Sequence, residues 1–339
     1  MNQSPHERLL LVGNPQSVHV GAHLEEGARD LGLGVRFCDA QQAFAAPSWH
    51  ARWNWRLRGH RPARLGGFSG VVVEACREFR PAWLLATGLA PIEESALRLI
   101  GELGVKRLNF LTDDPWNPTH RAPWFLRALP HYDHVFSPRR ANLAALREHG
   151  CAAVSYLPFA YAPSKHLANG AHPVDPAADV IFAGGADPDR VPPIAALIAA
   201  GFRLALYGGY WKRYPETRRY DLGHADLPTL RQAVTAAKIA LCLVRRANRD
   251  GHVMRTYELP AMGACLLTED TAEHREIFGA EGDAVLYFAS IPEMIEKARW
   301  LVGHDAERHQ LAVNAHVRIT GGRNTYRDRL AAMLNLSPS

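Results

Sequence analysis

Two acidic residues, Asp250 and Glu258, stand in the stretch Asn248–Leu267 with seven residues between them. Asp250 precedes a glycine, Gly251, which is typical of a turn, and Glu258 follows in a segment whose pattern predicts a helix. Arg255 lies three residues before Glu258, so the two side chains share one helix face. A cation beside a helix start is suited to binding a phosphate, and a carboxylate further along is suited to binding a ribose hydroxyl.

The start of this predicted helix would present unpaired backbone N–H groups and a partial positive charge. We expect a phosphate near Gly251 to Met254, a range that includes His252, and we expect the Glu258 carboxylate to hold a ribose. The alternative from spacing alone is an ordinary ion pair between Arg255 and Glu258 on a solvated helix, with Asp250 as a turn residue or cap.

The composition indicates a globular protein of 339 residues, enough for two domains that each have a core. Apolar residues make up 47% and charged residues 22%. The formal charge of +5 is mild, and the arginines are spread along the chain, so nucleic acid is not the expected partner. An anionic small ligand needs only a local patch of positive charge.

The cysteines are odd in number and form no CxxC motif, so we expect small buried thiols in a reducing compartment. They are Cys38, Cys76, Cys151, Cys242 and Cys265. The apolar run near the N-terminus is shorter than that of a secretory signal, and no segment approaches the roughly 18 apolar residues of a membrane span. We expect a cytoplasmic protein.

Short apolar runs alternate with amphipathic ones along the whole chain. The first half predicts helices at 23–31, 93–103 and 139–149, and strands at 8–13, 34–39, 82–88, 106–112, 134–138 and 153–158. A proline-containing interdomain linker is expected at Ala162–Asp179. The alternation then restarts with strands at 179–185, 203–209, 238–244, 264–269 and 284–289, and a helical stretch at 323–334 ends the chain.

Apolar strands separated by helices indicate parallel sheets that are covered on both faces. The predicted fold is therefore α/β, with two Rossmann-like, doubly wound domains at 1–165 and 175–320 that face a cleft. Ligands of such folds bind beyond the carboxyl ends of the strands, so the loops at those ends are where site residues are expected.

The loop after the first strand of the second domain contains Gly184 and Gly185, followed by Arg190. Glycines let the backbone approach a ligand closely, and an arginine near a helix start would neutralise a pyrophosphate. The alternative is a tight turn without a ligand. Neither the full GxGxxG pattern nor a P-loop lysine is present, so dinucleotide binding and ATP hydrolysis are not favoured.

The next strand ends in the run YGGYWKRY, which contains Lys212, and Gly223 and His224 precede a further helix that Asp226 would cap. Aromatic residues and glycines at this place are suited to a nucleobase. The alternative is that the aromatic side chains only cover the edge of the sheet.

Asp113 and Asp114 follow a buried strand of the first domain. Adjacent side chains point in different directions, so we expect at most one of them to act as a base or to bind an acceptor hydroxyl. The alternative is a turn aspartate before proline. The loop after the first strand carries His19 and His23, either of which would accept a proton near neutral pH.

The segment 48–67 is basic and rich in tryptophan. We expect it to contact the acceptor or an anionic surface, and the alternatives are a mobile insertion or a contact with a partner. No HExxH motif is present and the cysteine spacing does not suit zinc, so no metal is expected.

The chain resembles CgeB-like glycosyltransferases, relatives of the group 1 or family 4-type enzymes. The resemblance is carried by 248–267, 273–302 and 324–334 in the second half, and by LTDDPWNP, YDHVFSPRRANLAALREHG and YLPFAYAP in the first. It implies a GT-B fold in which the first domain binds the acceptor and the second the nucleotide-sugar donor. It also implies that the last helix, at 323–339, packs back on the first domain.

In that family two glutamates with this spacing contact the donor, the first its sugar and the second its ribose. Glu258 matches the second, whereas this chain has Asp250 at the first. The family's pair of cations on the diphosphate has three candidates here, Arg190, Lys212 and Arg255.

The reaction implied is metal-independent transfer of a sugar, with hexose or deoxyhexose as the transferred group, from a nucleoside-diphosphate sugar to a glycan, lipid-linked or protein hydroxyl. Retention of configuration is expected. An inverting reaction would need Asp113, Asp114 or His23 as a base. Two other readings remain, a binding protein without activity and a sugar-nucleotide epimerase of similar architecture.

Overall fold

The structure is a computed structural model that describes residues 7–45, 59–167 and 178–336. Most of the basic segment 48–67 and most of the expected linker 162–179 therefore lie outside the described residues. The chain forms two compact units. Unit 1 comprises 1–158, 247–249 and 326–339, and unit 2 comprises 159–246 and 250–325.

Unit 1 is built on a six-stranded parallel sheet with the order β2-β1-β3-β4-β5-β6. Its strands are β1 (Arg8–Gly13), β2 (Gly34–Asp39), β3 (Trp83–Thr87), β4 (Lys106–Phe110), β5 (His134–Ser137) and β6 (Val154–Tyr156). Its α-helices are α1 (Val20–Asp30), α3 (Leu65–Phe79), α4 (Glu94–Glu102), α5 (Pro123–Ala128), α6 (Leu143–Glu148) and α14 (Tyr326–Leu334). Short 3-10 helices are η2 (Ala40–Phe44), η3 (Leu129–His131) and η4 (Arg140–Asn142).

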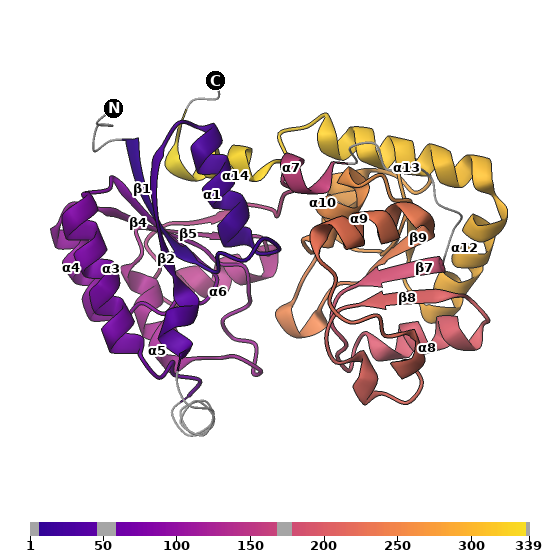
Figure 1. The fold of residues 1–339 in the computed structure, drawn as a ribbon, viewed down its shortest axis with the longest axis horizontal. Coiled ribbons are helices and arrows are strands. Elements are labelled where there is room, and N and C mark those ends of the chain that lie inside the picture. The colour runs from indigo at the N-terminus through magenta and orange to yellow at the C-terminus, as the bar shows by residue number, and fades with distance from the viewer. Residues whose placement is uncertain (1–6, 46–58, 168–177, 337–339) are drawn as a thin grey trace. The chain divides into compact units, whose positions relative to one another are not determined.

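Both faces of this sheet are covered, which explains why its strands are apolar throughout. Leu10 and Val12 of β1 pack into the cluster formed with α3, α4 and α5, whereas the alternate residues Leu9 and Leu11 are buried on the other face. Figure 1 shows α1 and α14 together on one side of the sheet and α3 and α4 on the opposite side.

Unit 2 contains a five-stranded parallel sheet with the order β11-β10-β9-β7-β8. Its strands are β7 (Ala178–Ala183), β8 (Leu204–Tyr207), β9 (Ala237–Cys242), β10 (Leu266–Glu269) and β11 (Leu286–Phe288). Its α-helices are α7 (Pro163–His166), α8 (Val191–Ala199), α9 (Leu227–Ala236), α10 (Arg255–Ala261), α11 (Ala272–Phe278), α12 (Ile291–Gly303) and α13 (Asp305–Thr320). The 3-10 helices η5 (Trp211–Arg213) and η6 (Arg218–Tyr220) follow β8.

The core of unit 2 lies between the sheet and the helices α8 and α12, with Leu311 of α13 joining it. The helices α9 and α10 contact the sheet through β7 and β9. Figure 1 shows α8 and α9 on opposite sides of β7 and β8.

The α/β prediction is confirmed: all eleven predicted strands are present, and both sheets are parallel. The main error is at strand ends, because a strand stops pairing before its apolar run ends. Gly184 and Gly185, for example, were predicted inside a strand but follow β7 as a turn. The segment expected to be a linker begins as helix α7, and the division between the units falls at Pro158 rather than near residue 165.

The five cysteines are buried and free, and burial raises the pKa of the Cys242 thiol to about 11. None of the helices formed by the described residues is long and apolar enough to cross a membrane.

Candidate functional site

The topology of unit 2 places its best ligand position between β7 and β9. β7 pairs with β8 on one side and with β9 on the other, so the chain leaves the carboxyl ends of these strands in opposite directions. Ligands of open parallel sheets bind at such a switch point. The loops that follow β7 and β9 at this point are 184–190 and 243–254.

Arg190 lies at this switch point and is 7% exposed. It precedes α8, its guanidinium donates to the Gly185 carbonyl at 3.3 Å, and it lies 5.6 Å from the centre of the Phe182 ring. Asp187 orients the turn, because its Oδ1 accepts hydrogen bonds from the backbone N–H groups of Asp189 and Arg190, both at 3.0 Å. The sequence therefore folds this loop so that a buried cation faces the end of β7.

Arg245 brings a second guanidinium to the same carboxylate. Asp187 Oδ2 lies 3.6 Å from Arg190 Nε and 3.8 Å from Arg245 Nε. Burial lowers the pKa of Arg190, and the charge of Arg245 lowers it further, whereas Asp187 and Asp250 act in the opposite direction. A bound anion would relieve the repulsion between the two arginines.

Two atoms of this cluster are buried without a hydrogen bond to any described residue, namely Arg190 Nε and Asp187 Oδ2. A buried polar atom left in this state costs about 1–3 kcal/mol. The cluster therefore has unused capacity to bind a ligand or water.

The predicted pair of Arg255 and Glu258 is present, but it does not lie on a solvated helix. Glu258 is only 1% exposed, its carboxylate accepts a hydrogen bond from Arg255, and His166 Nε2 lies 3.7 Å from its other oxygen. Arg255 Nε also donates to the carbonyl of Ala183, the last residue of β7, at 3.1 Å. The surface-pair alternative is wrong, and Arg255 joins Arg190 at the end of β7.

Gly251 and His252 do not fit the predicted phosphate contact. A Cβ on Gly251 would lie 2.5 Å from the side chain of Glu273, so this glycine admits that side chain. His252 is fully buried, and its Nδ1 donates to Glu273 at 2.5 Å. Its Nε2 accepts the backbone N–H of Phe159 at 3.2 Å, so both ring nitrogens are used inside the core. Helix α10 also has only seven residues, so the arginines supply most of the positive charge here.

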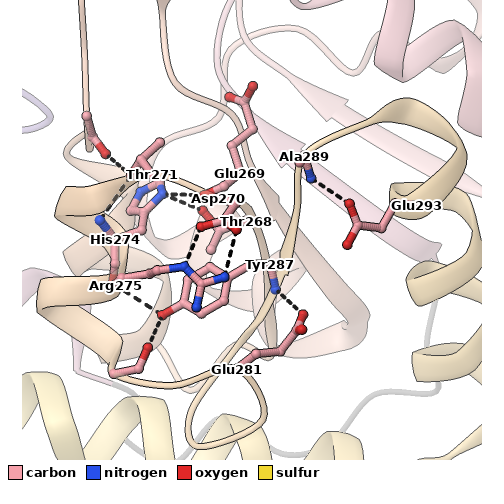
Figure 2. Close-up of polar contacts among 12 residues, drawn as sticks. Thr268, Glu269, Asp270, Thr271, His274, Arg275, Glu281, Tyr287, Ala289 and Glu293 are labelled. Carbon is pink, nitrogen blue, oxygen red and sulfur yellow. Dashed lines mark hydrogen bonds and ion pairs between the residues drawn. The ribbon is translucent and has the colours of Figure 1, made fainter.

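A second buried histidine, His274, supports the carboxyl end of β10. Its Nδ1 lies 2.8 Å from the Glu269 carbonyl oxygen and its Nε2 lies 3.0 Å from Thr256 Oγ1. Burial lowers the pKa of His274 to about 4, so the ring is neutral at neutral pH. Figure 2 shows this ring beside Thr268, with Arg275 paired to Asp270 nearby.

A pocket of about 310 Å³ lies at the carboxyl ends of β9, β10 and β11. Glu269 lines it and accepts hydrogen bonds from the Val244 N–H at 2.6 Å and from Arg246 at 2.9 Å. Burial raises the pKa of Glu269, although the hydrogen bond from Val244 and the charges of Arg246 and Arg190 oppose this shift. The pocket therefore adjoins the arginine cluster. Its walls are mainly apolar and include Pro192, Pro193, Leu243, Phe288 and Ile291.

The candidates in the region after β8 belong to a loop that packs against the glycine turn after β7, since the Gly209 carbonyl accepts a hydrogen bond from the Ala186 N–H at 2.9 Å. Lys212 is exposed, and its backbone N–H donates to Asp221 at 3.1 Å. Gly223 has a φ of +73° and His224 is exposed. Its Nε2 would lie 3.5 Å from a Cβ built on Gly209. Within the described residues no hydrogen bond or ion pair joins Lys212 to Arg190 or Arg255, so a role on the same phosphate is not supported.

In unit 1 the two aspartates after β4 have different environments. Asp114 is 1% exposed and accepts two hydrogen bonds from Arg249, at 2.5 and 3.1 Å. Asp113 is half-buried, and Asn248 donates to it at 3.5 Å. Asp114 is therefore used by an ion pair and does not suit the role of a base, which leaves Asp113.

The two histidines of the loop after β1, His19 and His23, also have different environments. His23 is buried and stacks on Tyr326 with ring centres 5.1 Å apart, which does not suit proton transfer with an acceptor. Desolvation lowers the pKa of His19, and the nearby Asp113 carboxylate opposes this shift. Asp113 therefore acts electrostatically on His19.

Sequence reasoning missed three members of these clusters: Asp187, Arg245 and Arg249. The signal for Asp187 is its place two residues before Asp189, in a pattern typical of a turn that precedes a helix. Arg245 and Arg249 stand in the run RRANRD, where sequence alone does not show which arginine turns toward which carboxylate.

Residues 191–335 match a family model described as glycosyl transferase-like. Among curated proteins, none matches the chain. Solved structures similar to it include sucrose-phosphate synthase from Thermosynechococcus elongatus, with a TM-score of 0.69, 12% identity and 97% of each chain covered. HepE from Anabaena, in complex with UDP and glucose, has a TM-score of 0.65, 12% identity and coverage of 97% and 99%.

A putative UDP-N-acetylglucosamine 2-epimerase from Listeria monocytogenes is similar as well, with a TM-score of 0.57, 12% identity and coverage of 96% of this chain and 94% of that one. At this identity the likeness concerns the fold. The chain therefore has a GT-B fold, in which residues 191–335 match the model described as glycosyl transferase-like.

Proposed function

We propose that this protein is a CgeB-like glycosyltransferase that moves a hexose or deoxyhexose from a nucleoside-diphosphate sugar to a hydroxyl acceptor. The observation that carries the proposal is the group of Arg190, Arg245 and Arg255 at the switch point of unit 2. A nucleoside diphosphate has the charge that such a group binds. The glycosyl transferase-like match of residues 191–335, and the UDP bound by HepE, support the same donor class.

The donor is proposed to extend along the carboxyl edge of the unit 2 sheet. Its diphosphate contacts Arg190 and Arg245, and its transferred sugar enters the adjoining pocket, where Arg246 and Glu269 offer polar partners. Glu258 holds the ribose in this proposal, with Arg255 and His166 fixing its carboxylate. Asp250, which acts electrostatically on Arg190, is proposed to contact the sugar.

Transfer is proposed to need no metal ion, because arginines stabilise the negative charge that develops on the leaving diphosphate. Retention of configuration is also part of the proposal. Under retention the acceptor attacks from the side of the leaving group, and no protein base is needed. This fits the ion pair of Asp114 and the burial of His23, and it leaves Asp113 to bind the acceptor hydroxyl.

Donor binding is tested by thermal unfolding of the wild type with UDP, GDP, ADP and dTDP, each with and without EDTA. We expect at least one nucleoside diphosphate to raise the midpoint, since a ligand at 100 times its Kd stabilises by about 2.7 kcal/mol. We expect EDTA to leave that rise unchanged. If none of the four shifts the midpoint, the donor site is wrong, and a rise that EDTA removes would contradict metal independence.

A further inference from the structure

Tyr210 has a backbone conformation that residues with side chains rarely adopt. It has a φ of +74° and a ψ of −3°, in the left-handed region. Such a conformation costs of the order of 1 kcal/mol for a residue other than glycine. Its side chain is nevertheless 59% exposed, so burial in the core does not repay the cost. An exposed aromatic residue kept in a strained position points to a role in binding.

The loop around Tyr210 is tied to the glycine turn after β7 by a hydrogen bond and by close backbone packing. Trp211, the next residue, is fully buried and its indole Nε1 donates to the Gly184 carbonyl at 2.8 Å. Gly208 has a φ of +139°, and a Cβ there would lie 2.3 Å from the Gly184 oxygen. The turn that holds Tyr210 is therefore fixed against the glycine turn after β7.

The ring of Tyr210 approaches the same glycine turn to which Arg190 donates a hydrogen bond. A Cβ built on Gly185 would lie 4.0 Å from Tyr210 Cδ2, and the Gly185 carbonyl accepts the hydrogen bond of Arg190. Arg213 lies over the Tyr210 ring at 4.2 Å from its centre. Tyr210 is 59% exposed with Arg213 in this position, so part of its ring surface is accessible to a ligand. An aromatic platform and a buried cation thus flank one two-residue backbone turn.

We propose that Tyr210 is the residue on which the nucleobase of the donor stacks, while Arg190 binds the diphosphate of the same molecule. This inference rests on the proposed donor site and adds a specific residue for the base. A base that stacks on an aromatic side chain gains about 1–3 kcal/mol, and every base has the π face that this needs. Arg213 covers part of the ring by its cation–π contact, and a base would stack on the ring surface that stays exposed.

The test compares Tyr210→Gly and Tyr210→Phe with the wild type. Kd is measured by calorimetry for the nucleoside diphosphate that the wild type binds best, and for inorganic pyrophosphate in competition with it. We expect Tyr210→Gly to weaken nucleoside-diphosphate binding about 10-fold, the ratio that stacking of this strength gives, and to leave pyrophosphate binding within about twofold. We expect Tyr210→Phe, which keeps the ring, to bind both as the wild type does.

Thermal unfolding separates this role from a structural one. Glycine adopts a positive φ without strain, so Tyr210→Gly should not lower the unfolding midpoint. The proposal is overturned if Tyr210→Gly keeps its nucleoside-diphosphate affinity, or if it loses pyrophosphate affinity to the same extent. If the wild type binds pyrophosphate but no nucleoside diphosphate, the proposed donor class fails together with the role of Tyr210. Normal nucleotide binding with an unaffected Tyr210→Gly variant would remove only the role of Tyr210.

Discussion

Replacing Arg190 with alanine is expected to weaken nucleoside-diphosphate binding by about 100-fold or more. The guanidinium is 7% exposed, and Gly185, Phe182 and Asp187 hold it in place, so a bound diphosphate would meet an immobilised charge in a poorly solvated position. Truncation of one partner of a buried, hydrogen-bonded charge pair costs about 2–5 kcal/mol, and each 1.4 kcal/mol is tenfold in affinity. The measurement is isothermal calorimetry with the nucleotide that binds the wild type.

Arg203→Ala is the matched control for this variant. Arg203 also forms an ion pair with an aspartate of unit 2, Asp179, at 3.1 Å, but at the amino end of β7 and β8 and with a side chain that is 61% exposed. We expect it to leave nucleotide affinity unchanged. If the folded Arg190→Ala and Arg203→Ala variants bind the nucleoside diphosphate with equal affinity, Arg190 does not bind the diphosphate.

Replacing Arg249 with alanine is expected to destabilise unit 1 by about 3 kcal/mol, the size seen when one partner of a buried ion pair is removed. Arg249 donates to both oxygens of Asp114 and to Asn142 Oδ1 at 2.9 Å. Without it, the 1% exposed Asp114 carboxylate loses its cation and keeps the hydrogen bond from the Trp116 N–H at 3.0 Å. Hydrogen exchange in peptides of unit 1 measures the change.

Removal of the other charge, in Asp114→Asn, should lower the stability of unit 1 by less than Arg249→Ala does. The Arg249 side chain is 42% exposed, so water can solvate it once its partner is neutral. Arg98→Ala serves as a control, since Arg98 and Glu94 form an exposed pair at 3.9 Å that is worth only about 0.5 kcal/mol. If the peptides of unit 1 exchange hydrogen as slowly in Arg249→Ala as in Arg98→Ala, the ion pair between Arg249 and Asp114 contributes nothing to the stability of unit 1.

The fold was predictable because its signal is local. Runs such as RLLLVG at 8–13 and GVRFCD at 34–39 match β1 and β2 in both end residues. Loops were less predictable, because the ends of strands depend on pairing with neighbours rather than on apolar character. The helix α7 was missed since Pro163 starts it in a segment whose prolines suggest a linker.

The candidate site was predictable in its residue types but only partly in its contacts. Arg190 was identified because it follows two glycines near a helix start, and Arg255 and Glu258 because they share one helix face beside a turn and match the family resemblance. The sharing of Asp187 by Arg190 and Arg245 depends on distances between two loops, which spacing within one loop does not give. The use of His252 and Asp114 inside the structure was missed for the same reason, as their partners Glu273 and Arg249 are set by the fold.

The most direct test of glycosyl transfer is a turnover experiment with the nucleotide sugars of the base that binds. Release of nucleoside diphosphate and the anomeric configuration of the product are followed by NMR, with and without a panel of hydroxyl acceptors and in the presence of EDTA. We expect release that requires an acceptor, persists in EDTA and gives a product with the donor's configuration. Conversion of the donor without any acceptor would instead indicate an epimerase, and tight binding with no turnover would contradict the proposed activity.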